Sequence, residues 1–109
     1  MSLVPPSRQS NNHKLYFSKS EISKILNCYS IGVSNGEWKD YALNFNYNEA
    51  VFFFFKHSLV SPDCILIKLK EKRKKRIIYR LSIKNKKNSK YENLDSLLVN
   101  LKRSQISII

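Results

Sequence analysis

The chain has 109 residues, 42% of them hydrophobic and 26% charged, with a formal net charge of +12. Such a length accommodates one domain with a modest core. Two cysteines, Cys28 and Cys64, are too few for a disulfide framework or a zinc site, and the longest apolar run, residues 50–55, is far too short to span a bilayer. We therefore expect a cytoplasmic protein with reduced cysteines, no metal, no cofactor and no membrane span.

The first 14 residues, MSLVPPSRQSNNHK, lack the apolar core of a signal peptide. Pro5 and Pro6 prevent helix formation there, so we expect a disordered polar arm. A helix is predicted over residues 18–34, because Ser18 and Glu21 have the spacing of a capping box and Gly36 suits a helix end. Its apolar stripe has helical spacing and consists of Ile22, Ile25, Leu26, Tyr29 and Val33.

Four strands are predicted next, over residues 38–45, 50–57, 64–70 and 77–84. Apolar and polar side chains alternate in three of them, as in half-buried antiparallel strands joined by short turns. The second strand differs, because Phe52 to Phe55 make both of its faces apolar. We expect one pair of these phenylalanines to pack under a helix and the other pair to be at least partly covered. An exposed pair would instead offer a platform on which nucleic-acid bases stack.

A second helix is predicted over residues 92–103, with an apolar stripe formed by Leu94, Leu97, Leu98 and Leu101. The expected fold class is α+β, with one antiparallel four-stranded meander sheet and a helix at each end of the domain. Residues 15–104 would form this single domain, and residues 105–109 an apolar tail.

The stretch GEWKDYALNF, residues 36–45, is the most specific part of a wider pattern. It follows the helical segment SEISKILNCYSIGVSN and precedes the run AVFFFF and a Leu-rich final helix. This pattern resembles an uncharacterised family of small alphaproteobacterial proteins, a domain of unknown function, over about residues 17–103. The resemblance implies a cytoplasmic bacterial protein, and it implies no catalytic residue because no activity is established for that family.

Nearly all of the net charge lies between residues 68 and 90, where Glu71 is the only acid. By alternation, four of the cations would share one sheet face, namely Lys68, Lys70, Arg80 and Lys84. The next five would form a hairpin tip, namely Lys72, Arg73, Lys74, Lys75 and Arg76. The last three would precede the second helix, whose free N–H groups attract phosphate, namely Lys86, Lys87 and Lys90.

Two alternative hypotheses for this basic segment stay open. It could be a solvated face that limits aggregation of an apolar sheet. It could also reflect AT-rich codon usage, because fifteen of the twenty cations are lysines. Codon usage explains the number of lysines but does not by itself explain their clustering.

Catalytic chemistry finds no support in the sequence, which has no nucleophile motif, no paired carboxylates and only two glycines for a phosphate loop. His57 has only Asp63 nearby and is expected at the surface. Trp38 and Asp40 would share one face of a strand and could line a small pocket, although a tryptophan more often fills a core. We therefore expect no enzyme.

The favoured hypothesis is a non-enzymatic module that binds RNA, or another polyanion, without sequence preference through the basic hairpin and sheet face. The order of elements is superficially similar to the double-stranded RNA-binding domain, but NYNE, residues 46–49, lacks the groove-reading residues of that domain. The alternative is a protein-interaction module with an acidic or apolar partner.

Overall fold

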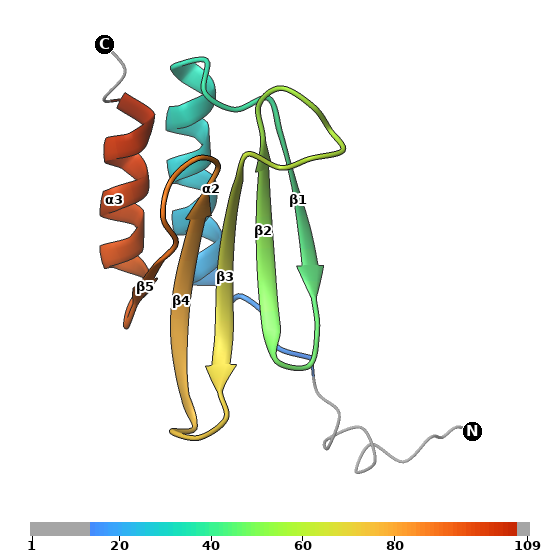
Figure 1. Ribbon diagram of the computed structural model, residues 1–109, viewed down its shortest axis with the longest axis vertical. Coiled ribbons are helices and arrows are strands. Elements are labelled where there is room, and N and C mark those ends of the chain that lie inside the picture. The colour runs from blue at the N-terminus through green and yellow to red at the C-terminus, as the bar shows by residue number, and fades with distance from the viewer. Residues whose placement is uncertain (1–13, 107–109) are drawn as a thin grey trace, which may run out of the picture.

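A computed structural model describes residues 14–106, so most of the predicted polar arm (1–14) and of the apolar tail (105–109) lies outside the described residues. The first and last elements are helices α2 (Lys19–Ser34) and α3 (Leu94–Ile106). Five strands lie between them, namely β1 (Asp40–Phe45), β2 (Glu49–Phe55), β3 (Cys64–Glu71), β4 (Arg76–Ile83) and β5 (Ser89–Tyr91). The predicted α+β class is confirmed (Figure 1).

The strands form one antiparallel sheet in the order β1-β2-β3-β4-β5, which is the predicted meander with one strand more. The prediction of four strands is wrong in this detail. The added strand, β5, pairs three residues with β4, and its register places Lys90 opposite Arg80. Three residues are too few for an alternating pattern to stand out in a sequence, so pairing with β4 defines this strand.

Both helices pack on the same face of the sheet, and no helix of the described residues covers the other face (Figure 1). Phe52 and Phe54 of β2 point to the helices and are fully buried. The Tyr29 ring of α2 lies 5.4 Å from that of Phe54, centroid to centroid. Each such phenylalanine contributes about 1.5–3 kcal/mol by burial, which makes β2 the centre of the core.

The other face is here called the open face. The sheet register brings side chains from all five strands together on it, and its large apolar side chains, from β2, β3 and β4, are mostly only partly buried. Its apolar members are Val51, Phe53, Phe55, Ile65, Ile67, Leu69 and Ile78. Of the four phenylalanines, two therefore pack under the helices and two are partly covered, as predicted.

Helix α2 begins where its capping box predicts. Ser18 Oγ accepts a hydrogen bond from the Glu21 N–H at 3.1 Å, and Glu21 Oε1 accepts one from the Ser18 N–H at 2.7 Å. Two of the free N–H groups at the helix start are satisfied in this way. The helix ends at Ser34 with Asn35 as its C-cap, and Gly36 follows with a φ of 75°, a left-handed value that glycine adopts without strain.

A buried polar cluster joins the two helices to the start of β1. Gln105 Oε1 accepts a hydrogen bond from Trp38 Nε1 at 2.7 Å, and Gln105 Nε2 donates one to the Cys28 carbonyl at 3.1 Å. Gln105 is 1% exposed and belongs to α3, so the predicted boundary between domain and tail at residue 105 is wrong. Gly32 is buried against the Trp38 ring, where no larger residue fits.

Candidate nucleic-acid interface

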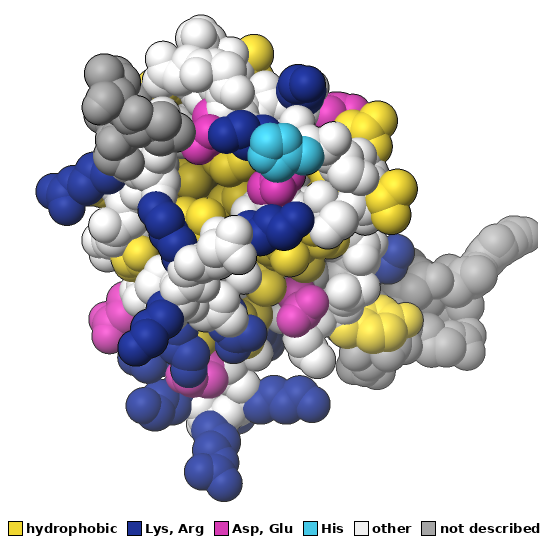
Figure 2. Space-filling view, turned by 45° about the horizontal axis from the view of Figure 1, so that its top comes forward, with side chains coloured by type: hydrophobic (Ala, Val, Ile, Leu, Met, Phe, Trp, Pro, Cys, Tyr) yellow, Lys and Arg dark blue, Asp and Glu magenta, His cyan; other side chains and the backbone are white. Residues whose placement is uncertain are grey.

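The β3–β4 hairpin carries the densest group of cations. Its turn consists of Lys72, Arg73, Lys74 and Lys75, all exposed and all without a side-chain hydrogen bond or ion pair to any described residue. Figure 2 shows Lys and Arg side chains projecting from the lower end of the molecule, which is the hairpin end in Figure 1. Charges this close together repel each other, and an anion placed among them would relieve that repulsion.

The hairpin closes directly beneath these four residues with an ion pair. Arg76 Nε lies 2.9 Å from Glu71 Oε1, and the same guanidinium lies 3.8 Å from a Glu92 oxygen. The hydrogen bond from Arg76 holds the pKa of Glu71 below its ordinary value. Arg76 is therefore partly neutralised, and the turn itself supplies the free charge.

Lys68 was predicted to contact nucleic acid, but its ammonium group is already held in an ion pair with Glu21. It points to the covered face, where its Nζ contacts Glu21 Oε1 at 2.8 Å and the Tyr16 carbonyl at 2.9 Å. The Tyr79 hydroxyl donates to the other oxygen of Glu21. Burial alone would raise the pKa of Glu21, but the hydrogen bonds from Lys68, Tyr79 and the Ser18 N–H outweigh it and lower that pKa.

The prediction that Lys68, Lys70, Arg80 and Lys84 share one sheet face is therefore wrong. The β3–β4 register pairs Lys68 with Tyr79 and Ile67 with Arg80. Paired residues lie on the same face, so Arg80 points to the open face and Lys68 to the covered one. Alternation distinguishes the two faces of each strand, but only the register decides which faces of neighbouring strands coincide.

The cations that precede α3 also lie elsewhere than expected. Lys86 Nζ contacts Ser104 Oγ at 3.2 Å, close to the C-terminal end of α3, and Lys90 lies in β5. The helix start is capped by Asn93, whose Oδ1 accepts from the Ser96 N–H at 2.8 Å. The predicted group of lysines at the helix N-terminus is thus not formed. Lys87 is exposed in the turn before β5.

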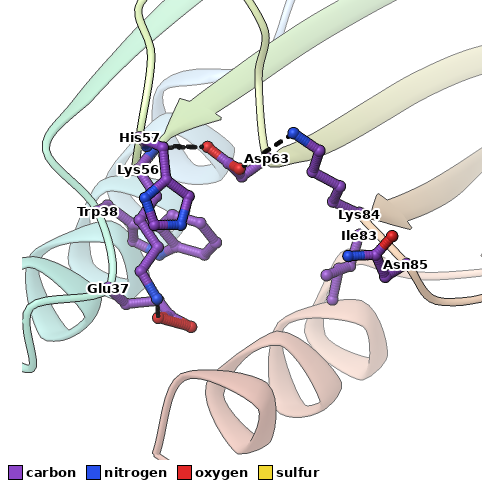
Figure 3. A pocket seen from close by; sticks show the side chains of 8 residues that line it. All are labelled: Glu37, Trp38, Lys56, His57, Asp63, Ile83, Lys84 and Asn85. Carbon is purple, nitrogen blue, oxygen red and sulfur yellow. Dashed lines mark hydrogen bonds and ion pairs between the residues drawn. The ribbon is translucent and has the colours of Figure 1, made fainter.

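Trp38 and Asp40, the predicted pocket residues, border different hollows. Trp38 lines a cavity of about 310 Å³ (Figure 3), and Asp40 lines a neighbouring one of about 260 Å³ with Phe55. Trp38 is 5% exposed and its N–H already has a partner in Gln105. The pair therefore forms no common pocket.

The charges around the Trp38 cavity satisfy one another. Lys56 Nζ lies 2.9 Å from Glu37 Oε1, and Lys84 Nζ lies 3.9 Å from Asp63 Oδ1 (Figure 3). Asp63 also accepts the backbone N–H groups of Lys56 and His57. Its burial acts to raise its pKa, and these hydrogen bonds, with the charges of Lys84 and His57, lower it. These contacts hold the β2–β3 loop against the end of β4.

Sequence reasoning underestimated the open face. The signal was present, because Ile65, Ile67 and Leu69 alternate with Leu66 in β3 just as Phe53 and Phe55 alternate with their neighbours in β2. Apolar residues on both sides of two adjacent strands indicate a cover on both sides. Helices α2 and α3 pack next to each other on one face of the sheet, so neither of them covers the open face.

The fold defines a two-layer α+β domain, an antiparallel meander sheet with two helices on one face and a basic hairpin at one end. The chain belongs to the family described as "Protein of unknown function (DUF2794)", which matches residues 15–98. The predicted likeness to a domain of unknown function is thereby confirmed. No curated protein and no solved structure matches the chain.

Neither helix of the described residues is long and apolar enough to cross a bilayer. Within residues 14–106, no group of three or more His, Cys, Asp and Glu side chains is placed to hold a metal ion. Burial raises the pKa of Cys28 to about 11 and raises that of Cys64 as well. Both thiols therefore stay protonated near neutral pH and lack the reactivity of a thiolate.

Proposed function

We propose that this protein is a non-enzymatic module that binds nucleic acid, RNA in particular, through its basic hairpin and without sequence preference. The observation that carries the proposal is the hairpin turn itself, in which Lys72, Arg73, Lys74 and Lys75 lie next to each other, exposed and without a side-chain hydrogen bond or ion pair to any described residue. Protein cations that neutralise phosphates release counterions from the nucleic acid, which is a main source of nonspecific affinity.

Other cations of the charged segment extend this site along the sheet. Arg80 and Lys90 lie next to each other on the open face of β4 and β5 without an ion pair to any described residue. Lys70 is exposed on the other face of β3, the face of Lys68. Lys68 contributes no contact, because its ammonium group is held by Glu21. Among the described residues, the exposed turn makes no side-chain contact that would fix a guanidinium against one base, so we propose binding without sequence preference.

The test replaces the four turn residues by serine and leaves Arg76 and its ion pair intact. Binding of single- and double-stranded RNA is measured at about 50 mM and about 200 mM salt. We expect the variant to bind all sequences more weakly and its log–log salt slope to flatten by about 0.7–0.9 for each phosphate that it no longer neutralises. Its melting temperature should stay the same or rise slightly, because exposed charges contribute only a few tenths of a kcal/mol.

A control removes the same number of charges from the two helices, by replacing Lys19, Lys24, Lys102 and Arg103 with serine. Of these four cations, Lys24 is paired with Asp95 at 3.0 Å. An equal loss of affinity in both variants would show a general effect of net charge and would refute the hairpin as the site. A wild-type protein that fails to bind RNA at low salt would refute the proposal as a whole and leave the turn as a solvated tip.

A protein-interaction module is the second candidate, and the open face is the observation that favours it. The face combines apolar side chains with charged ones at its edges, a composition that protein interfaces share. Capture of one defined protein that survives nuclease treatment would support this candidate. Loss of every captured protein after nuclease treatment would support the nucleic-acid proposal.

A further inference from the structure

We infer that the open face binds single-stranded nucleic acid, with the rings of Phe53 and Phe55 as the surfaces on which its bases stack. This inference rests on the proposed function and adds the site and the strandedness of the ligand. The hairpin supplies charge alone, whereas the open face supplies flat aromatic surface beside charge. Single-stranded nucleic acid offers unpaired bases and phosphates together, and proteins bind it with that same combination of aromatic rings and cations.

The two rings are placed for this role by the alternation of β2. Phe53 and Phe55 are two residues apart, so both project from the open face, and their centroids lie 6.4 Å apart with an interplanar angle of 35°. Both side chains are partly exposed, in contrast to Phe52 and Phe54. Phe55 also borders the hollow of about 260 Å³ at its end of the sheet, together with Lys39 and His57.

Cations occupy the far side of the same face. Arg80 of β4 and Lys90 of β5 are register partners and lie two and three strands from Val51, which precedes Phe53 on the open face. A second hollow, of about 330 Å³, lies at the hairpin end, and its charged lining consists of Lys74, Arg76 and Lys90 together with Glu71 and Glu92. A strand running from Phe55 to the hairpin would meet aromatic rings first and cations afterwards.

Acidic residues of the open face limit where the phosphates can lie. Glu71 and Glu92 are already paired with Arg76. Asp40 and Glu49 stand on β1 and β2, at the side opposite Arg80. Like charges repel, so the phosphates are expected over β4 and β5 and the bases over β2 and β3.

Charge also decides between this ligand and a second copy of the chain. A net charge of +12 opposes self-association, because two copies brought face to face would add their charges. A duplex would satisfy the cations but would keep its bases stacked on each other, so the phenylalanine rings would gain nothing from it. The face therefore favours an anionic ligand with free bases.

The test uses the full chain and three probes of equal length, about 12 nucleotides, which exceeds the smallest site of a comparable sheet. They are an oligothymidylate, the same oligonucleotide with abasic sites throughout, and a duplex. We expect the wild type to bind the oligothymidylate at least about 5-fold more tightly than the abasic strand, and up to about 150-fold for each base stacked. Phe53→Leu and Phe55→Leu, which keep apolar bulk, should remove this preference and leave abasic and duplex binding unchanged.

A second measurement does not depend on the variants being folded. Photo-crosslinking of a 5-bromouracil oligonucleotide to the wild type should place the crosslink within β2, and mass spectrometry of the digested protein would locate it. Equal wild-type affinity for the thymidylate and abasic strands, or crosslinks confined to the hairpin, would overturn the inference and leave the proposed function standing. Failure to bind any of the three probes would overturn the inference, and failure to bind RNA at low salt as well would overturn the proposed function. A dimer in sedimentation that Phe55→Leu dissociates would overturn the inference in favour of a second copy.

Discussion

Replacing Gly32 by alanine would insert a methyl group where the structure has no room for one. A Cβ at this position would lie 2.2 Å from Trp38 Cδ1, 2.4 Å from Trp38 Nε1 and 3.0 Å from the Gln105 side-chain carbonyl carbon. Contacts under about 3 Å do not persist in proteins, so the tryptophan ring, the helix or both must move. Trp38 is the anchor of the buried polar cluster, and its displacement would also break the hydrogen bond from Nε1 to Gln105.

The magnitude follows from three contributions. Overpacking a core costs about 1–3 kcal/mol, and leaving the buried Gln105 oxygen or the Trp38 N–H unsatisfied costs about 1–3 kcal/mol more. Against these, alanine gains about 1 kcal/mol over glycine in helix propensity. We therefore expect Gly32→Ala to lower the free energy of unfolding by about 1–5 kcal/mol, which is a large part of the stability of a small domain.

Urea denaturation followed by tryptophan fluorescence measures this change directly, because Trp38 is the only tryptophan of the chain. Ser30→Ala is the matched control, since Ser30 lies on the exposed side of the same helix and should change little or gain stability. If Gly32→Ala were as stable as the wild type, or more stable, the close contact between α2 and the Trp38 ring would be wrong. The packing of α3 through Gln105 would then be in doubt as well.

Two further predictions concern the core and the ion pair beneath α2. Phe54→Ala should lower the free energy of unfolding by about 3–5 kcal/mol because this side chain is fully buried, and Phe53→Ala should lower it by less than half as much. Equal losses for the two variants in urea denaturation would contradict the assignment of the two faces. Because the pKa of Glu21 is lower in the folded protein than its ordinary value of 4.5, its ion pair contributes stability above pH 4.5 that is lost as the pH falls through the folded pKa. The Glu21→Gln variant should therefore lose less stability than the wild type on acidification, and the difference between the two losses should be on the order of 1 kcal/mol. Parallel stability–pH curves for the two proteins would argue against the pairing of Glu21 with Lys68.

The sequence by itself determined the local elements. The capping box of Ser18 and Glu21 set the start of α2, and Gly36 marked its end. Alternation defined three of the five strands. The four consecutive phenylalanines marked a fourth strand, and they divided into a buried and a partly exposed pair as a strand requires. These features depend on interactions between residues close in the chain, so their patterns are visible without the fold.

Only the tertiary structure decided which faces coincide and what covers them. Lys68 pairs with Glu21, 47 residues away, because the register places it on the same side as Tyr79. Gln105 meets Trp38 over a separation of 67 residues, a contact for which the sequence shows no pattern. Both helices pack on one side of the sheet, and this leaves Phe53 and Phe55 on the same open face as Arg80 and Lys90. Strand register and helix placement depend on many contacts between residues far apart in the chain, so a local periodicity in the sequence does not predict them.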